Sequence, residues 1–244
     1  MAQAWARLRP HVQVSGPAGR APTVLLFHGC GGVRPQLFDY ARAAADLGVR
    51  AVIVDSYAPR GWSRTFGMAF VCTGLTFWGR ERAGDVLAAA WGAVRDLDAD
   101  PDRLVLAGWS HGGWSIMDLM TMPLTAPGEA GLADASAEAL SGLRGVFLGY
   151  PYGGAGALTR RRRWVRTPRV FGVLATRDRV THPRDSDRLF EQLKSCGAEV
   201  ELWRADGAHC FDEPGALLAA LRYDPFLAAE AVTRFRTFLA DAVR

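Results

Sequence analysis

Cysteine is scarce in this sequence and scattered along it. The four cysteines form no CxxC pair and no spacing typical of metal ligands; they are Cys30, Cys72, Cys196 and Cys210. A small secreted domain held together by disulfides uses more cysteines at closer intervals. We therefore expect neither a disulfide framework nor a metal site.

Long hydrophobic runs are also missing. Met1–Pro10 lacks the apolar core of a secretory signal and carries Arg7 and Arg9. No apolar run approaches the roughly 18 to 20 residues that a membrane span needs. The sequence therefore predicts a cytoplasmic protein without a membrane partner.

Lysine is nearly absent, since Lys194 is the only lysine among 29 basic residues. The net charge of +4 would suit a nucleic-acid partner. The positive charge is, however, spread along the chain, apart from the run Arg160–Arg163. We therefore expect no nucleic-acid partner.

What is present suits one large domain, because the chain has 244 residues, of which 49% are hydrophobic and 22% charged. Apolar runs with the length of buried strands alternate with helical patterns, and His11–Ser15 adds a candidate edge strand. The alternation predicts an α/β fold with one doubly wound, mostly parallel sheet and helices on both faces. The predicted buried strands are Thr23–Phe27, Arg50–Asp55, Leu104–Ala107, Gly145–Gly149, Arg169–Ala175 and Glu199–Trp203. The predicted helices are Pro35–Leu47, Arg80–Leu97, one that begins at Trp114, Asp185–Cys196 and Asp224–Val243.

Three segments stand outside this alternation. Residues 1–20 form an N-terminal segment that includes the edge strand. Separately, Asp100–Asp102 is predicted to be a turn that leads into the strand before Ser110. Ser56–Gly79 is long, irregular and rich in aromatic residues, which fits either a functional loop or a packed surface loop. Residues 123–142 are predicted to be a small cap or a surface excursion, with a short helix around Asp134–Leu140.

The stretch Arg103–Trp114 reads R-L-V-L-A-G-W-S-H-G-G-W and joins a strand to a helix. A serine centred in G-x-S-x-G lies on a tight turn, where Gly108 and Gly112 avoid collisions with the neighbouring backbone. The turn exposes the Ser110 hydroxyl at a helix N-terminus, which favours developing negative charge. Ser110 is therefore the candidate nucleophile.

A serine nucleophile needs a base, and the base needs a third group that orients it. Ligands of a parallel sheet bind outside the carboxyl ends of its strands, so these partners are expected just after late strands. Asp178 follows the strand Arg169–Ala175, and His209 follows the strand Glu199–Trp203. The order Ser110, Asp178, His209 predicts a catalytic triad. Three nearby acids compete with Asp178: Asp185, Asp187 and Asp206.

Acyl transfer also needs N–H donors for the developing oxyanion. One is expected from His111, the residue after the nucleophile. The loop His28–Gly32, with the sequence H-G-C-G-G, is expected to supply the N–H of Cys30. A tight turn or a phosphate cradle is the alternative, but the loop lacks the G-x-G-x-x-G spacing and the Lys-Ser/Thr pair of a P-loop.

Together these motifs resemble the α/β-hydrolase superfamily and, within it, the dienelactone hydrolase family. The resemblance extends from about Ala21 to the C-terminus. It is carried by H-G-C-G-G at His28, V-D-S-Y-A-P-R-G at Val54, G-W-S-H-G-G at Gly108, D-R-V-T-H-P at Asp178 and G-A-H-C-F at Gly207. The resemblance implies the α/β-hydrolase fold and hydrolysis of esters or lactones. Dienelactone hydrolases proper use cysteine as the nucleophile, so Ser110 favours a more general ester substrate.

The same resemblance suggests residues that bind substrate. Dienelactone hydrolases hold a substrate carboxylate with arginines, and Arg60 is the nearest candidate by context; alternatively, it is a loop arginine bonded to backbone carbonyls. Tyr150 and Tyr152 follow the strand Gly145–Gly149 and are expected either to line the pocket mouth or to pack against Ser56–Gly79.

The expected function is hydrolysis of a small-molecule ester or lactone without cofactor or metal. In this mechanism Ser110 attacks, His209 transfers the proton, and Asp178 holds the imidazolium. An acyltransferase or a peptidase would use the same groups. A non-catalytic binding protein would keep the fold but would not need all three residues.

Overall fold

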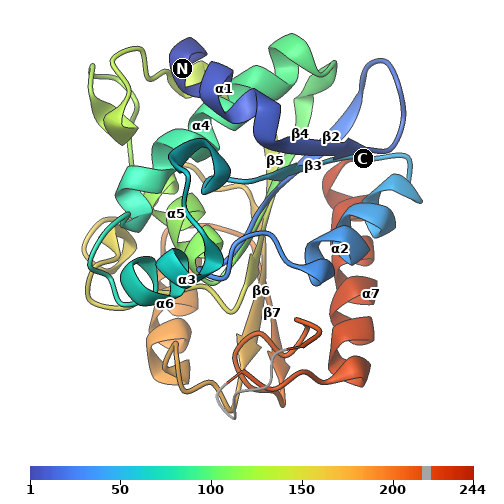
Figure 1. Cartoon of the computed structure of the whole chain (residues 1–244), viewed down its shortest axis with the longest axis vertical. Helices are drawn as coiled ribbons and strands as arrows, with labels where there is room; N and C mark the ends of the chain where they lie inside the picture. Colours follow the sequence, from blue (N-terminus) through green and yellow to red (C-terminus); the bar gives the residue numbers. More distant parts are fainter. Residues whose placement is uncertain (216–220) are drawn as a thin grey trace.

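Seven strands form one sheet in the computed structural model, which describes residues 1–215 and 221–244. Along the sheet the strands are ordered β1-β3-β2-β4-β5-β6-β7. Figure 1 shows the sheet between helices on its two sides. β1 runs antiparallel to β3, and the other neighbouring pairs are parallel. The predicted doubly wound, mostly parallel sheet with an edge strand at its start is confirmed. The bounds are Val12–Ser15 (β1), Ala21–Phe27 (β2), Arg50–Val54 (β3), Ala99–Trp109 (β4), Leu143–Gly149 (β5), Arg169–Ala175 (β6) and Val200–Ala205 (β7).

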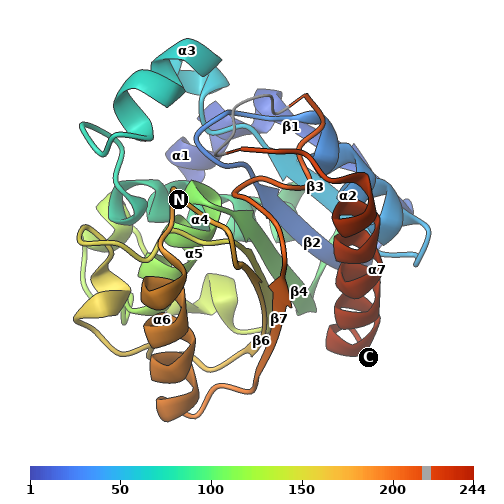
Figure 2. The same cartoon turned by 90° about the horizontal axis from the view of Figure 1, so that it is seen from below.

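Helices cover both faces of the sheet (Figure 2). α2 (Pro35–Ala45) and α7 (Pro225–Ala242) pack on one face. The other face carries α1 (Ala2–Leu8), α4 (Gly79–Asp96), α5 (His111–Met120) and α6 (Pro183–Ser195). The remaining helical turns are α3 (Arg64–Phe66), a π-helical turn at Gly67–Val71 and 3₁₀ turns at Arg9–His11, Ala58–Arg60, Glu129–Gly131, Ala137–Leu140 and Leu158–Arg160. Among the described helices, none is both long and apolar enough to cross a membrane.

The centre of the sheet is built from strands that are apolar on both faces. In β2, Leu25 and Phe27 pack toward α4 and α5, whereas Val24 and Leu26 pack toward α2. This pattern explains why the run reads as continuously hydrophobic, because a parallel strand covered by helices on both sides has no solvent face. Since the central strands are parallel, the loops at their carboxyl ends meet at one edge of the sheet.

The last strand differs from its prediction. Glu199–Trp203 was predicted to be buried, but β7 is the edge strand, and Glu201 and Arg204 are exposed. The prediction of a strand at this place is confirmed; its burial is wrong, because β7 has a pairing partner, β6, on one side only.

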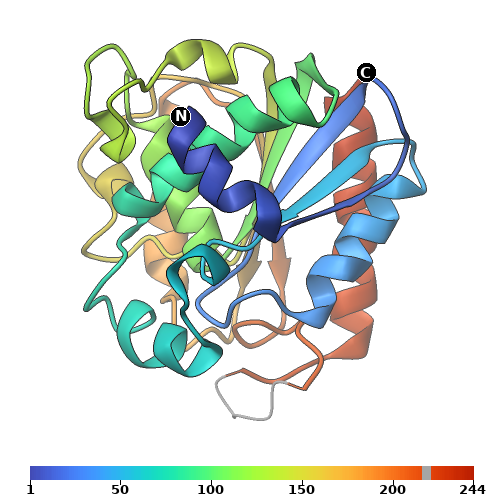
Figure 3. The ribbon, with the colours of Figure 1, turned by 45° about the horizontal axis from the view of Figure 1, so that its top comes forward.

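The N-terminal segment contains a helix that the sequence did not predict. Trp5 of α1 is 3% exposed and packs over Gly92 of α4, where a Cβ atom would lie 2.1 Å from the indole. The indole Nε1 donates to Asp96 at 2.5 Å. A seven-residue helix has little stability of its own and forms here because it packs on α4 (Figure 3).

Two further boundaries depend on long-range contacts. Asp100–Asp102 was predicted to be a turn but belongs to β4, which begins at Ala99 and pairs there with Ala21. The segment of residues 123–142 forms two 3₁₀ turns that contact α4. The turn at Ala137–Leu140 replaces the predicted short helix.

Candidate active site

Ser110 lies on a strained turn between β4 and α5. Its backbone has φ 49° and ψ −110°, a left-handed conformation that costs free energy for a residue with a side chain. The turn packs tightly against neighbouring backbone. A Cβ atom on Gly112 would lie 2.1 Å from the Phe27 carbonyl oxygen, and a Cβ atom on Gly108 would lie 2.6 Å from the backbone of Gly112. Glycine is therefore required at both positions if the serine is to project from the sheet.

His209 connects Ser110 to Asp178. Its Nε2 lies 2.9 Å from the Ser110 hydroxyl, and its Nδ1 lies 2.7 Å from a carboxylate oxygen of Asp178. Asp178 follows β6 and His209 follows β7, so three separate strand ends supply the three side chains. All three are buried. The structure thus brings together the three residues that the sequence predicted.

Asp178 is held in its ionised form. Its carboxylate accepts hydrogen bonds from the backbone N–H groups of Val180 and Thr181 at 2.7 and 2.8 Å, and from the Thr181 hydroxyl at 2.6 Å. Burial raises the pKa of Asp178, but the hydrogen bond and charge of His209 outweigh it and hold the pKa below its ordinary value. An ionised Asp178 accepts a hydrogen bond from the Nδ1–H group of His209, which leaves Nε2 unprotonated and free to act as a base.

The pKa of His209 is raised above its ordinary value. Burial lowers this pKa, whereas the Cys210 sulfur and the Asp178 carboxylate raise it. Burial also raises the pKa of Cys210, which keeps its sulfur a neutral thiol. We therefore attribute the raised pKa of His209 to Asp178. Stabilisation of the imidazolium by a fixed carboxylate is what a general base needs.

Two backbone segments meet beside the Ser110 hydroxyl. His111 is the first residue of α5, so its N–H has no partner within the helix. The loop His28–Gly32 lies against the elbow, since a Cβ atom on Gly29 would lie 3.4 Å from the Ser110 Cβ. Cys30 of this loop lines the same two cavities as Ser110. The loop and the helix start that are expected to supply the oxyanion donors therefore both adjoin the Ser110 turn.

Two cavities have Ser110 in their lining. The first, here called the tryptophan cavity, has a volume of about 290 Å³ and is lined by Val71, Trp78, His111, Trp114, Tyr152 and Gly156, among others. The second, here called the arginine cavity, has a volume of about 230 Å³ and is lined by Gly31, Arg34, Arg64, Met68, His209 and Glu213, among others. Ser110, Cys30, Cys72 and Val180 line both. None of the residues 123–142 lines either cavity.

Solved structures with a similar architecture include hydrolases. A putative dienelactone hydrolase from Klebsiella pneumoniae subsp. pneumoniae MGH 78578 is 16% identical, with a TM-score of 0.66 over 94% of this chain and 92% of that one. Esterase 2 of Thermogutta terrifontis, phosphorylated by paraoxon, is 17% identical, with a TM-score of 0.69 over 94% and 88%. The dienelactone hydrolase-like promiscuous phosphotriesterase P91, from metagenomic libraries, is 16% identical, with a TM-score of 0.64 over 93% and 89%. The chain has the α/β-hydrolase fold. No protein-family model matches the sequence, and no curated protein matches it.

The site around Ser110 contains a buried arginine that the sequence did not reveal. Arg82 of α4 is fully buried and donates to the His28 carbonyl at 2.7 Å and to the Ser56 hydroxyl at 3.1 Å. The same guanidinium lies 3.1 Å from Nδ1 of His111, whose Nε2 lies 2.7 Å from the Phe77 carbonyl. Arg82 therefore ties the His28–Gly32 loop to the start of α5. In the sequence, Arg82 could be singled out only as a charged residue within the apolar stripe of a predicted helix.

His28, in the loop after β2, and His111, at the start of α5, are both held in the neutral form. Burial and the charge of Arg82 lower the pKa of His28 and hold that of His111 well below its ordinary value. His28 Nδ1 lies 2.7 Å from the Gly29 carbonyl, and its Nε2 accepts from the Ser56 N–H at 3.2 Å. These two side chains hold the backbone of the His28–Gly32 loop and of the start of α5 in place.

The predicted substrate-binding residues lie in different places. Arg60 forms a two-pronged ion pair with Asp85 at 2.8 and 3.0 Å, donates to the Ser56 carbonyl, and is not among the residues that line either cavity. Tyr152 lines the tryptophan cavity and packs on Trp114, with ring centroids 4.7 Å apart. Tyr150 lines the arginine cavity, and its ring lies 4.8 Å from that of His209.

The segment Ser56–Gly79 forms the outer wall of both cavities. Trp62, Phe66 and Phe77 pack around the buried ring of Tyr57. A Cβ atom on Gly67 would lie 2.4 Å from the Cys30 carbonyl oxygen, so the π-helical turn packs directly on the loop His28–Gly32. The aromatic residues therefore pack as a small core of their own while Met68, Cys72 and Trp78 face the site.

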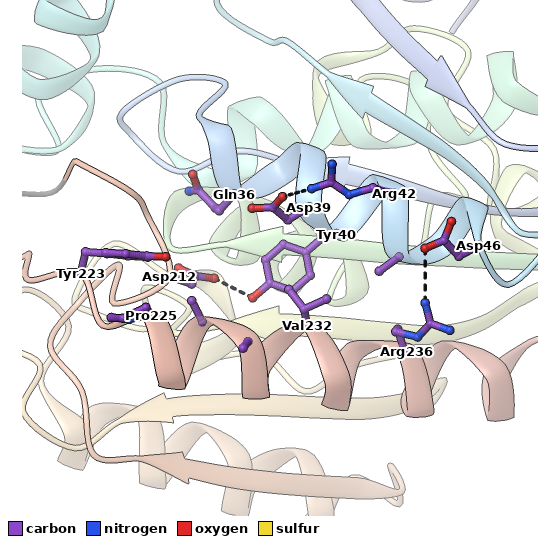
Figure 4. Close-up of a pocket in the computed structure, with 13 residues that line it drawn as sticks. Gln36, Asp39, Tyr40, Arg42, Asp46, Asp212, Tyr223, Pro225, Val232 and Arg236 are labelled. Carbon is purple, nitrogen blue, oxygen red and sulfur yellow. Dashed lines mark hydrogen bonds and ion pairs between the residues drawn. The ribbon is translucent and has the colours of Figure 1, made fainter.

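A separate groove of about 400 Å³ lies between α2 and α7 (Figure 4). None of the three triad side chains lines it. At its floor, Asp212 accepts hydrogen bonds from the hydroxyls of Tyr40 and Tyr150 at 2.6 and 2.5 Å. Burial raises the pKa of Asp212. These bonds anchor the loop that carries His209.

Across the described residues, no group of three or more His, Cys, Asp or Glu side chains is arranged to hold a metal ion.

Proposed function

We propose that the protein is a serine carboxylic-ester hydrolase of the dienelactone hydrolase-like kind. One observation carries the proposal: the His209 ring contacts both the Ser110 hydroxyl, at 2.9 Å, and the Asp178 carboxylate, at 2.7 Å. A structural histidine in this place would need neither a strained serine on one side nor an ionised carboxylate on the other. The hydrolases among the similar structures support the same reading.

The proposed reaction has two halves. In the first, His209 Nε2 takes the Ser110 proton as Oγ attacks the ester carbonyl, and the tetrahedral oxyanion accepts hydrogen bonds from the N–H groups of Cys30 and His111. The oxyanion collapses, the C–O bond to the alcohol breaks, and the proton on His209 passes to the departing alkoxide. In the second half, His209 takes a proton from water as the water attacks the acyl carbonyl. The C–O bond to Ser110 then breaks, His209 returns the proton to Oγ, and the carboxylic acid leaves.

Turnover of short-chain p-nitrophenyl esters tests this proposal. We expect Ser110→Ala to lower kcat by about 10⁴-fold or more, because the nucleophile, base and acid act as one unit. Ser115→Ala is the matched control: Ser115 is buried on the same helix, and its hydroxyl donates only to carbonyls of its own helix. Wild-type protein that turns over no ester, or a Ser110→Ala variant as active as Ser115→Ala, would refute the function.

A further inference from the structure

The two cavities beside Ser110 differ in their relation to the base. His209 lines the arginine cavity and is not among the residues that line the tryptophan cavity. His111, which is expected to supply an oxyanion N–H, lines only the tryptophan cavity. A substrate that extends from Ser110 into both cavities therefore has its two ends in unlike surroundings.

The path of the proton fixes which end goes where. In acyl-enzyme formation the departing oxygen must lie within hydrogen-bond reach of His209 Nε2, because that nitrogen returns the proton. Resting on the proposed function, we infer that the leaving alcohol binds in the arginine cavity and the acyl group in the tryptophan cavity.

The tryptophan cavity suits a small, uncharged and flat acyl group. The Trp114 ring lies near the rings of Trp78 and Tyr152, with centroids 6.4 and 4.7 Å away. Among the described residues that line this cavity, none is arginine, lysine, aspartate or glutamate, and the buried His111 is neutral. An ionised acyl group would lose its hydration there without gaining a partner. The volume of about 290 Å³ is at the low end for ligand pockets, which limits the acyl group to a short chain or one ring.

The walls of this cavity are fixed from behind. The Trp114 indole donates to Asp118 at 2.8 Å, and the other oxygen of Asp118 accepts from the Leu158 N–H at 2.7 Å. Asp118 thereby ties Trp114 to the segment that carries Gly156. A Cβ atom on Gly156 would lie 3.2 Å from the Trp114 ring and 3.4 Å from the Trp78 ring, so the missing side chain leaves space between the indoles.

The arginine cavity suits a polar or anionic alcohol. Arg34 lies 2.7 Å and Arg64 lies 3.4 Å from the same oxygen of Glu213. Two guanidinium groups on one carboxylate leave a surplus positive charge beside the leaving-group position. Guanidinium groups bind carboxylates and other oxyanions well. The substrate class that fits both cavities is an ester of a small apolar acid with an alcohol that carries an anionic group.

Matched ester series test the acyl half of this assignment. We expect Gly156→Ala to lower kcat/KM for p-nitrophenyl benzoate by about tenfold or more relative to the acetate, since one methylene in a pocket changes discrimination by roughly 10- to 200-fold. Trp78→Ala, which enlarges the cavity, should shift the same ratio in favour of benzoate. Met68→Ala, in the arginine cavity, should leave the ratio unchanged within about threefold.

The leaving-group half is tested with 3-butyryloxy-4-nitrobenzoate, which has an anionic leaving group, and the neutral p-nitrophenyl butyrate. We expect Arg64→Gln to lower kcat/KM for the anionic ester about threefold relative to the neutral one, an effect that weakens with added salt because Arg64 is half-exposed. Gly156→Ala should leave this ratio unchanged.

The possible outcomes separate the two proposals. Absence of Ser110-dependent turnover across both series refutes the proposed function and the assignment with it. The assignment is overturned, and the proposed function stands, if the variants act on the opposite ends of the substrate. In that case Met68→Ala and Arg64→Gln change acyl selectivity, while Gly156→Ala changes leaving-group selectivity. Turnover in which no variant changes either ratio also overturns the assignment.

Discussion

Asp178 is the residue whose role can be separated most sharply from that of its neighbours. It contacts His209 directly, whereas Asp206, one of its sequence competitors, is exposed and pairs with Arg177 at 3.1 Å. Asp185, a second competitor, lies 3.3 Å from Arg160. The orientation and tautomer of His209 therefore depend on Asp178.

We predict that Asp178→Asn lowers kcat by about 10⁴-fold, because an amide in this place favours the wrong tautomer of His209. Asp206→Asn is the control, and its kcat should stay within about twofold of wild type, since a surface ion pair contributes little. Steady-state kinetics with one p-nitrophenyl ester measures both. A mild Asp178→Asn combined with a severe Asp206→Asn would show that the acid is assigned wrongly.

The pKa of His209 predicts the pH dependence of catalysis. His209 must be neutral to accept the Ser110 proton, and its pKa is raised by Asp178. Activity should therefore be lost as the pH falls through this raised pKa, so the acid limb of kcat/KM should lie above about pH 6.5, the ordinary value for histidine. A pH–rate profile measures the limb; kcat/KM that stays constant down to pH 5 would exclude His209 as the base.

The sequence predicted these side chains because each follows a strand end or a short motif. Ser110 has flanking glycines, and Asp178 and His209 come directly after apolar runs of strand length. Arg82 has no such local signal, because its hydrogen-bond partners lie 26 to 54 residues away along the chain. Which cavity Tyr150 and Tyr152 face likewise depends on contacts with distant segments.

At the scale of elements, the tight approach of α5 to β2 determines where the nucleophile lies. The turn at Ser110 is possible because the backbone of Gly112 lies against the Phe27 carbonyl. A side chain there would force the helix and the strand apart.

We predict that Gly112→Ala lowers the free energy of unfolding by about 1–3 kcal/mol or more, because the added methyl would lie 2.1 Å from a backbone oxygen that cannot move aside. Gly153→Ala is the matched control, since its Cβ would meet only ordinary contacts, the nearest at 3.4 Å from Leu189. Urea denaturation measures both variants. Equal stabilities would contradict the close packing described for the elbow.

At the scale of the whole molecule, the fold was predictable because strands and helices alternate along the chain. A strand covered on both faces reads as a continuous apolar run, which identified β2 to β6 from sequence alone. The burial of β7 was predicted wrongly, because the order of strands in the sheet decides which strand lies at the edge. α1 escaped prediction altogether, since its stability comes from α4.

The packing of α1 gives a prediction at this scale. We expect Trp5→Ala to lower the free energy of unfolding by about 3–5 kcal/mol, because Trp5 is 3% exposed and fills the space above Gly92. Its kcat/KM per folded molecule should equal that of wild type, since Trp5 lines neither cavity. Phe226→Ala, at a position 86% exposed, should change stability by less than about 0.5 kcal/mol. A Trp5→Ala variant as stable as Phe226→Ala would contradict the role of α1.

The central claim is that His209 and Asp178 make Ser110 a nucleophile. Mass spectrometry after treatment with a fluorophosphonate tests it most directly, because this reagent forms a stable bond to an activated serine and needs no knowledge of the natural ester. The account predicts one label per chain, located on Ser110 by peptide mapping, none on Ser110→Ala, and much slower labelling of His209→Ala. An unlabelled wild-type protein, or a label on another residue that persists in Ser110→Ala, would contradict it.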